Sequence, residues 1–75
     1  MDKVYWLMFY EGGTFSNAIG NPHPNKAYAL MALGRFRSEL QQQGFTVDVI
    51  GDGITYDRYG TPCMITIEEK QYEEE

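Results

Sequence analysis

The stretch PNKAYALMALGRFRSELQQQG, residues 24–44, decides the fold, because it carries the clearest pattern of an amphipathic helix. At 100° per residue, one stripe of the helix collects apolar side chains, with Leu30 at its margin. The stripe consists of Ala29, Leu33, Phe36 and Leu40. Pro24 suits the first helical position, since its missing N–H would have no helical partner, and Gly44 suits the left-handed residue that ends a helix. We therefore predict a helix over residues 24–43, packed through this stripe on a sheet.

Strand patterns lie on both sides of this helix. Residues 3–10 (KVYWLMFY) are apolar at consecutive positions, as in an interior strand with both faces at least partly covered. The Gly12-Gly13 pair then suits a tight hairpin turn. Residues 14–19 fit either a short return strand or an ordered loop, and the pattern does not choose between them.

Three further strands are expected after the helix. Residues 45–51 alternate, which predicts that Phe45, Val47 and Val49 point inward. Two more strands, at 54–57 and 61–69, flank residues 58–60, where Gly60 suits a hairpin loop of three to five residues. In the last strand, one face is expected to carry Cys63, Ile65 and Ile67, and the other Met64, Thr66 and Glu68.

This order of elements predicts an α+β fold. We expect a single two-layer domain over residues 1–67, with a mostly antiparallel sheet of four or five strands and one helix on one face. Residues 68–75 are expected to form an acidic C-terminal tail that can continue the last strand in part. A single helix cannot cover both faces of such a sheet, yet residues 3–10 present large apolar side chains to both. The sequence thus predicts apolar surface that the helix leaves uncovered.

The charge distribution narrows the class of partner. The net charge is −5, but residues 68–75 hold five acids and one lysine, whereas residues 1–67 hold six acids and five bases. A nucleic-acid binder would be expected to carry a basic patch, and a DNA mimic would spread carboxylates over its whole surface. The pattern therefore disfavours both classes.

No constellation for catalysis, a cofactor or a metal is found. Cys63 is the only cysteine and His23 the only histidine, so a four-ligand zinc site of Cys and His cannot form. We interpret Cys63 as a small core residue and His23 as a helix-start residue. Asp48, Asp52 and Asp57 lack the spacing of a calcium loop and are interpreted as turn or surface residues. The prediction is a non-enzyme with no cofactor and no metal.

Two surfaces are predicted to bind a partner. One is the outer helix face, where Tyr28, Met31 and Arg35 are of residue types enriched in interfaces. The other is the uncovered sheet face, to which we assign the aromatic residues Tyr5, Phe9 and Tyr56. Together with Tyr59, these could also stack the bases of a single-stranded nucleic acid.

The favoured function is a non-catalytic protein-interaction module. Its size and acidity suggest an inhibitor of the phage or mobile-element type that binds a host protein or nuclease. The alternatives are a homo-oligomeric structural or accessory protein and a sheet that binds single-stranded nucleic acid. The apolar run Val4 to Tyr10 is too short to span a bilayer and precedes no small-residue cleavage site, so we expect a cytoplasmic protein without membrane contact.

Overall fold

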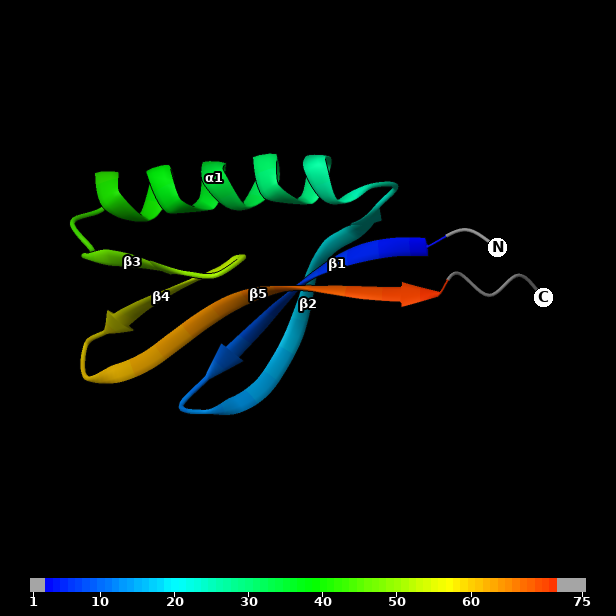
Figure 1. Ribbon diagram of the computed structural model, residues 1–75. Helices are drawn as coiled ribbons and strands as arrows, with labels where there is room; N and C mark the ends of the chain where they lie inside the picture. The colour runs from blue at the N-terminus through cyan, green and yellow to red at the C-terminus, as the bar shows by residue number, and fades with distance from the viewer. Residues whose placement is uncertain (1–2, 72–75) are drawn as a thin grey trace.

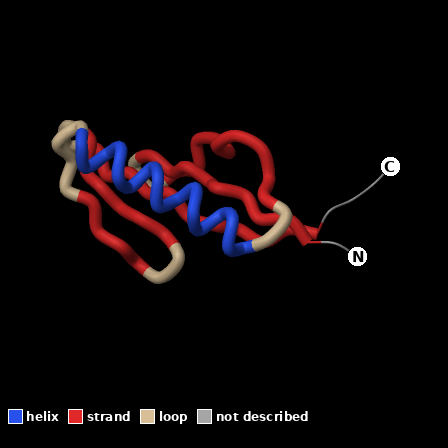
Figure 2. Tube along the Cα trace, turned by 90° about the horizontal axis from the view of Figure 1, so that it is seen from above, coloured by secondary structure: helices blue, strands red, loops and turns tan. Residues whose placement is uncertain are grey.

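The computed structural model describes residues 3–71 and consists of one helix packed against a five-stranded antiparallel sheet (Figure 1). This confirms the predicted α+β class. In chain order the elements are β1 (Lys3–Glu11), β2 (Thr14–His23), α1 (Lys26–Gln42), β3 (Val47–Ile50), β4 (Gly53–Arg58) and β5 (Thr61–Gln71). Seen from above, α1 crosses the sheet with strands visible on both sides of it (Figure 2).

The strand order is β2-β1-β5-β4-β3, which makes β1 an interior strand as expected. β1 pairs with β5 over nine positions, from Lys3 opposite Gln71 to Glu11 opposite Cys63. β5 continues through Gln71, so the first half of the acidic run, residues 68–71, lies in the sheet. The rest of the expected tail, residues 72–75, lies outside the described residues.

Residues 14–19 form a strand, and it runs on to His23. Gly12 and Gly13 make the expected turn, with φ of +61° and +83°. The pairing of β1 with β2 shifts register twice, between Tyr5 and Leu7 and between Phe9 and Tyr10. β2 is therefore an irregular edge strand.

The helix begins later than predicted. Asn25 caps it, with its side chain accepting a 2.9 Å hydrogen bond from the Tyr28 N–H. Pro24 thus precedes the helix, and His23 ends β2 instead of starting the helix, so both expectations were wrong. The reason is that an Asn side chain satisfies a free N–H of the first turn, which a proline at the first position cannot do.

The predicted helix end is confirmed. Gly44 has φ +97° and donates to the Gln41 carbonyl, while Phe45 donates to the Leu40 carbonyl, both at 3.0 Å. These two bonds form a Schellman motif, which satisfies carbonyls that the helix itself leaves free.

The hairpin between β4 and β5 is tighter than expected. Arg58 pairs with Thr61, which leaves a two-residue loop of Tyr59 and Gly60 in place of the predicted three to five residues. Both have positive φ, +53° and +94°, as a tight type I′ turn requires. The predicted loop was too long because only Gly60 was expected to adopt a left-handed conformation, whereas Tyr59 adopts one as well.

The core lies between α1 and one face of the sheet. Its buried members are Leu7, Ala29, Leu33, Ile54 and Ile65. Phe36 and Leu40 pack against this cluster, so the predicted helix stripe is confirmed. Cys63 is buried at 2% exposure, as expected of a core residue. Within residues 3–71, α1 is neither long nor apolar enough to cross a membrane.

Val49 is less covered than expected. It lies opposite the core residue Ile54, on the side of α1 as predicted, but its side chain is 55% exposed. β3 lies at the edge of the sheet, where the narrow helix gives little cover.

Candidate functional site

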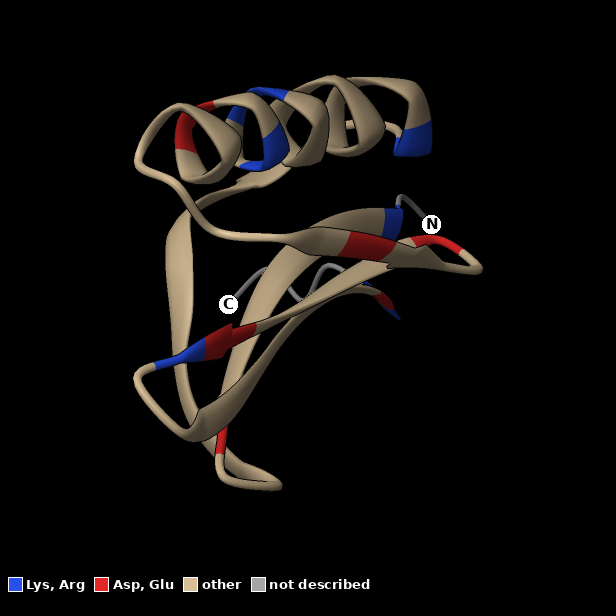
Figure 3. Ribbon diagram, turned by 90° about the vertical axis from the view of Figure 1, so that its left-hand side faces the viewer, with Lys and Arg blue, Asp and Glu red and all other residues tan. Residues whose placement is uncertain are grey.

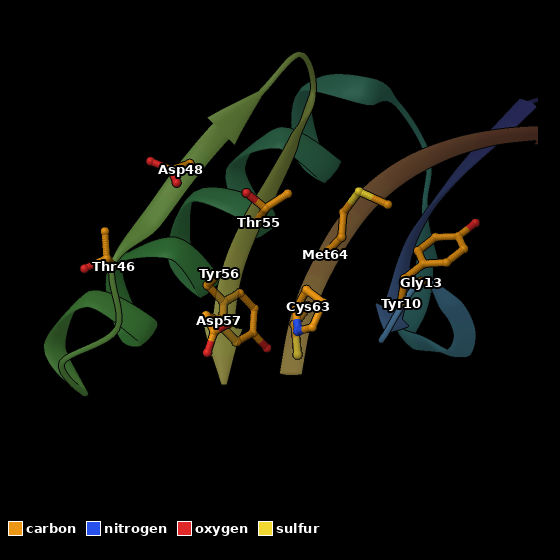
Figure 4. Close-up of a pocket in the computed structure, with 10 residues that line it drawn as sticks. Tyr10, Gly13, Thr46, Asp48, Thr55, Tyr56, Asp57, Cys63 and Met64 are labelled. Carbon is orange, nitrogen blue, oxygen red and sulfur yellow. The ribbon is translucent and has the colours of Figure 1, made fainter. Parts of the chain in front are cut away.

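The sheet face opposite α1 carries a row of side chains that crosses all five strands. Asp48 lies opposite Thr55, and Thr55 opposite Met64. Met64 in turn lies opposite Tyr10, and Tyr10 opposite Phe15. Figure 4 shows four of these five side chains on one side of the sheet, with the helix behind it. We call this side the bare face.

A second set of apolar residues adjoins this row on β1. Strand alternation divides the apolar run: Tyr5, Leu7 and Phe9 face α1, and the residues between them face away from it. We name five apolar residues of β1, β2 and β5 on the bare face the bare-face patch; it consists of Trp6, Met8, Tyr10, Phe15 and Met64. Phe15 is 48% exposed, whereas Met8 is only 8% exposed and anchors the patch in the sheet. The predicted mismatch between one helix and two apolar sheet faces is therefore present.

The bare face is hollowed between β1 and β3. The depression has a volume of about 520 Å³ and reaches from Tyr10 to Thr46 and Asp48, with Met64 in between. It is open to solvent and not an enclosed cavity, so a surface of another macromolecule can contact its lining.

Tyr10 is held in place on this face by two contacts. Its phenol donates a 2.9 Å hydrogen bond to Glu68, and its ring meets the Phe15 ring edge-on at 5.7 Å. The hydrogen bond to Glu68, followed by desolvation, raises the pKa of Tyr10 above its ordinary value of 10.0. The ring is therefore a neutral, oriented part of the patch at neutral pH.

Most charged groups of the bare face are acidic, and Lys70, two residues after Glu68 in β5, is the basic exception. Within residues 3–71, the three ion pairs are Lys3–Glu69, Lys26–Asp52 and Arg58–Glu11. Asp48, Asp57 and Glu68, which border the patch, belong to none of these pairs. Figure 3 shows basic residues along α1, on the other side of the sheet, and Lys26, Arg35 and Arg37 are half of the six basic residues. The two layers thus differ in charge.

The outer helix face is exposed as expected. Tyr28 is 53% exposed and Met31 56% exposed, and Arg35 is also exposed. Met31, Gly34 and Arg35 line a shallow depression of about 430 Å³ with Ser38 and Glu39.

The expected placement on the uncovered face was wrong for Tyr5 and Phe9, which pack against the core on the side of α1. Because Leu7 is buried there at 1% exposure, residues two positions away from it must share that side. Tyr56 also packs against the core, but it lines the depression of the bare face as well (Figure 4). Tyr59, the fourth aromatic residue considered for nucleic-acid stacking, is 93% exposed at the β4–β5 turn. The stacking platform built from these four residues therefore does not exist.

The signal for the correct set was present in the sequence. Residues two positions from Leu7 in β1 share its face. The residues between them, Trp6, Met8 and Tyr10, therefore belong to the opposite face. The same alternation in β5 separates Met64 from Ile65. Phe15 cannot be assigned in this way, because its position depends on the register of an irregular strand.

The residues considered for catalysis or metal binding lie apart from one another. The Cys63 thiol is buried and donates to the Thr61 carbonyl at 3.6 Å. His23 is half-buried in β2, opposite Tyr5. Over residues 3–71, no group of three His, Cys, Asp or Glu side chains lies close enough together to hold a metal ion.

Comparison with known proteins gave no match to this chain among protein families, curated proteins or solved structures. The functional argument therefore depends on the geometry described above.

Proposed function

We propose that the chain is a protein-interaction module that binds its partner through the bare face. The observation that carries this proposal is the bare-face patch, which spans β5, β1 and β2 on the side without a helix and is continued over β4 and β3 by Thr55 and Asp48. Large exposed apolar surfaces framed by polar groups are typical of protein–protein interfaces, and aromatic and Met side chains are enriched there.

The charges of the bare face indicate the chemistry of the partner. Asp48, Asp57 and Glu68 would repel a nucleic acid, so they favour a partner surface that is apolar in its centre and basic around it. Such a basic surround occurs at nucleic-acid-binding grooves of enzymes. An inhibitor of the phage or mobile-element type that occupies such a groove is the specific form of this proposal.

The experiment compares two equally exposed aromatic side chains on opposite layers. Phe15→Ala removes an aromatic ring of the bare face that is 48% exposed. Tyr28→Ala removes an aromatic ring of the outer helix face that is 53% exposed. Each variant and the wild type are immobilised and incubated with an extract of the source cells, and the retained proteins are quantified by mass spectrometry.

We expect proteins that are retained by the wild type and by Tyr28→Ala but lost with Phe15→Ala. Their retention should also fall as salt is raised, because exposed charge pairs are screened. Retention that is lost with Tyr28→Ala and kept with Phe15→Ala would transfer the binding role to the outer helix face. Absence of any retained protein would contradict the proposal.

A further inference from the structure

β3, at one edge of the sheet, carries a second exposed apolar surface. Val49 and Ile50 are 55% and 62% exposed, and Leu30 on α1 is 42% exposed. The Lys26–Asp52 ion pair fixes the start of α1 beside the β3–β4 turn, and Leu30 lies one helical turn further along the same flank. Val49 lies opposite the core residue Ile54 and so faces the α1 side, whereas Ile50 faces the bare side. We call Leu30, Val49 and Ile50, which border the free edge of β3 on both sides of the sheet, the β3 edge patch.

The two edges of the sheet differ in regularity. β2 has two register shifts, a left-handed Gly20 with φ +67° and a proline at position 22, all of which hinder pairing with another strand. β3 pairs with β4 without any shift over its four residues. Its outer edge is therefore the one that can accept a further strand.

The β3–β4 hairpin determines which backbone groups point outward. Ile50 and Gly53 flank the two-residue loop and are paired with each other. In such a hairpin the flanking residues exchange their hydrogen bonds, and the bonding direction alternates along the strand. Asp48 therefore also bonds toward β4, and the N–H and C=O groups of Val47 and Val49 point to the free edge.

We propose that β3 pairs antiparallel with β3 of a second copy of this chain, about a two-fold axis at Val49. A two-fold axis perpendicular to the sheet pairs the outward-bonding residues of the two copies if it passes at position 47, 48 or 49. At Asp48 it would place two carboxylates opposite each other, which is destabilising. At Val47 it would place Val49 opposite Phe45, which lies outside the strand. At Val49 it brings the two Val49 side chains together on the α1 side, and it places Ile50 of each copy opposite Asp48 of the other.

The size of the contact sets its strength. A stable interface buries about 800 Å² per partner, and three partly exposed side chains with a few backbone bonds bury less. The dimer is accordingly a weak one that forms at high protein concentration. The resulting ten-stranded sheet leaves both bare faces free, so one dimer would offer two docking faces to a partner.

The test is sedimentation equilibrium from about 10 μM to 1 mM. The wild type should rise from the monomer mass of 8.6 kDa toward twice that value. Val49→Pro removes an outward N–H and leaves the β3–β4 ladder intact, so it should stay monomeric. Val49→Lys should do the same without any backbone change. Met31→Ala, which truncates a 56% exposed side chain on the outer helix face, should dimerise like the wild type.

The register is tested with charge at position 50. With the axis at Val49, Ile50 lies opposite Asp48 of the second copy, so Ile50→Lys should tighten dimerisation about three- to tenfold and Ile50→Asp should weaken it by a similar factor. A wild type that is monomeric at 1 mM, or a folded Val49→Lys variant that still dimerises, would overturn the proposal. Equal dimerisation of the two Ile50 variants would overturn the register. The Val49 and Met31 variants change no side chain of the bare face, so their outcome is independent of the proposed function. Ile50 shares the bare face with Asp48, so its variants test the register only.

Discussion

The Tyr10 phenol and the Glu68 carboxylate are joined by a 2.9 Å hydrogen bond between β1 and β5 on the bare face. The bond fixes the orientation of the Tyr10 ring, which in turn meets Phe15 edge-on. The apolar centre of the face is thus tied directly to its acidic border.

This bond predicts a pH dependence. Because the pKa of Tyr10 is raised by the hydrogen bond to Glu68, the bond stabilises the fold in full below pH 10, and this contribution is lost as the pH rises through the raised pKa. The difference in free energy of unfolding between the wild type and Tyr10→Phe should therefore shrink between about pH 8 and about pH 11. Urea unfolding at both pH values measures it, and Glu68→Gln should behave like Tyr10→Phe. A difference that stays constant with pH would contradict the assignment.

Two glycines should respond to alanine in opposite directions. At Gly34, in α1, an added Cβ meets nothing within 4 Å, so Gly34→Ala should stabilise the protein by about 0.5–1 kcal/mol through helix propensity. At Gly53 the Cβ would lie 2.9 Å from the Ile65 backbone oxygen, so Gly53→Ala should destabilise by about 1–3 kcal/mol. Chemical denaturation of both variants checks the signs, and a stabilising Gly53→Ala would show that β4 and β5 are less closely packed.

Tyr59 should tolerate asparagine better than valine. Its φ of +53° is left-handed, a conformation that Asn adopts readily and a β-branched residue does not. Tyr59→Val should be less stable than Tyr59→Asn by about 1–2 kcal/mol, although valine is the better strand former. Both variants lose the Tyr59 ring contact with Phe45, so the comparison isolates the backbone effect. Equal melting temperatures would mean that the turn is not of this type.

Leu33 and Tyr28 test the orientation of the helix. Leu33 is 6% exposed, so Leu33→Ala should cost about 2–5 kcal/mol of stability. Tyr28→Ala, at a 53% exposed position, should change stability by no more than about 0.5 kcal/mol. Urea denaturation measures both. A large loss with Tyr28→Ala would show that the helix is rotated about its axis.

The sequence predicted those parts of the fold that depend on local patterns. The helix stripe followed from the spacing of Leu33, Phe36 and Leu40, and the helix end from Gly44. The helix start was missed because Pro24 and Asn25 are both good initiators, and the choice depends on which one caps the first turn.

The candidate site was predicted only as a kind of surface. One helix can cover only one face of the sheet, so the sequence predicted that apolar residues would remain uncovered. However, Tyr5 and Phe9, which were assigned to the uncovered face, lie on the covered face. Tyr5 and Trp6 are equally apolar neighbours, and only the burial of Leu7 decides which of them faces α1. The position of Phe15 depends on the register shifts of β2, which no local pattern encodes.

The pairing of β1 with β5 also affects how the protein is made. During synthesis β1 leaves the ribosome about fifty residues before its main partner, and it can pair only with the irregular β2 until then. The sheet is completed only when residues 61–71 have emerged. Until then the apolar side chains of β1 are exposed in a partly folded chain, and exposed strands are prone to aggregate. Translation speed and chaperone supply should therefore influence the yield of this protein more than its small size would indicate.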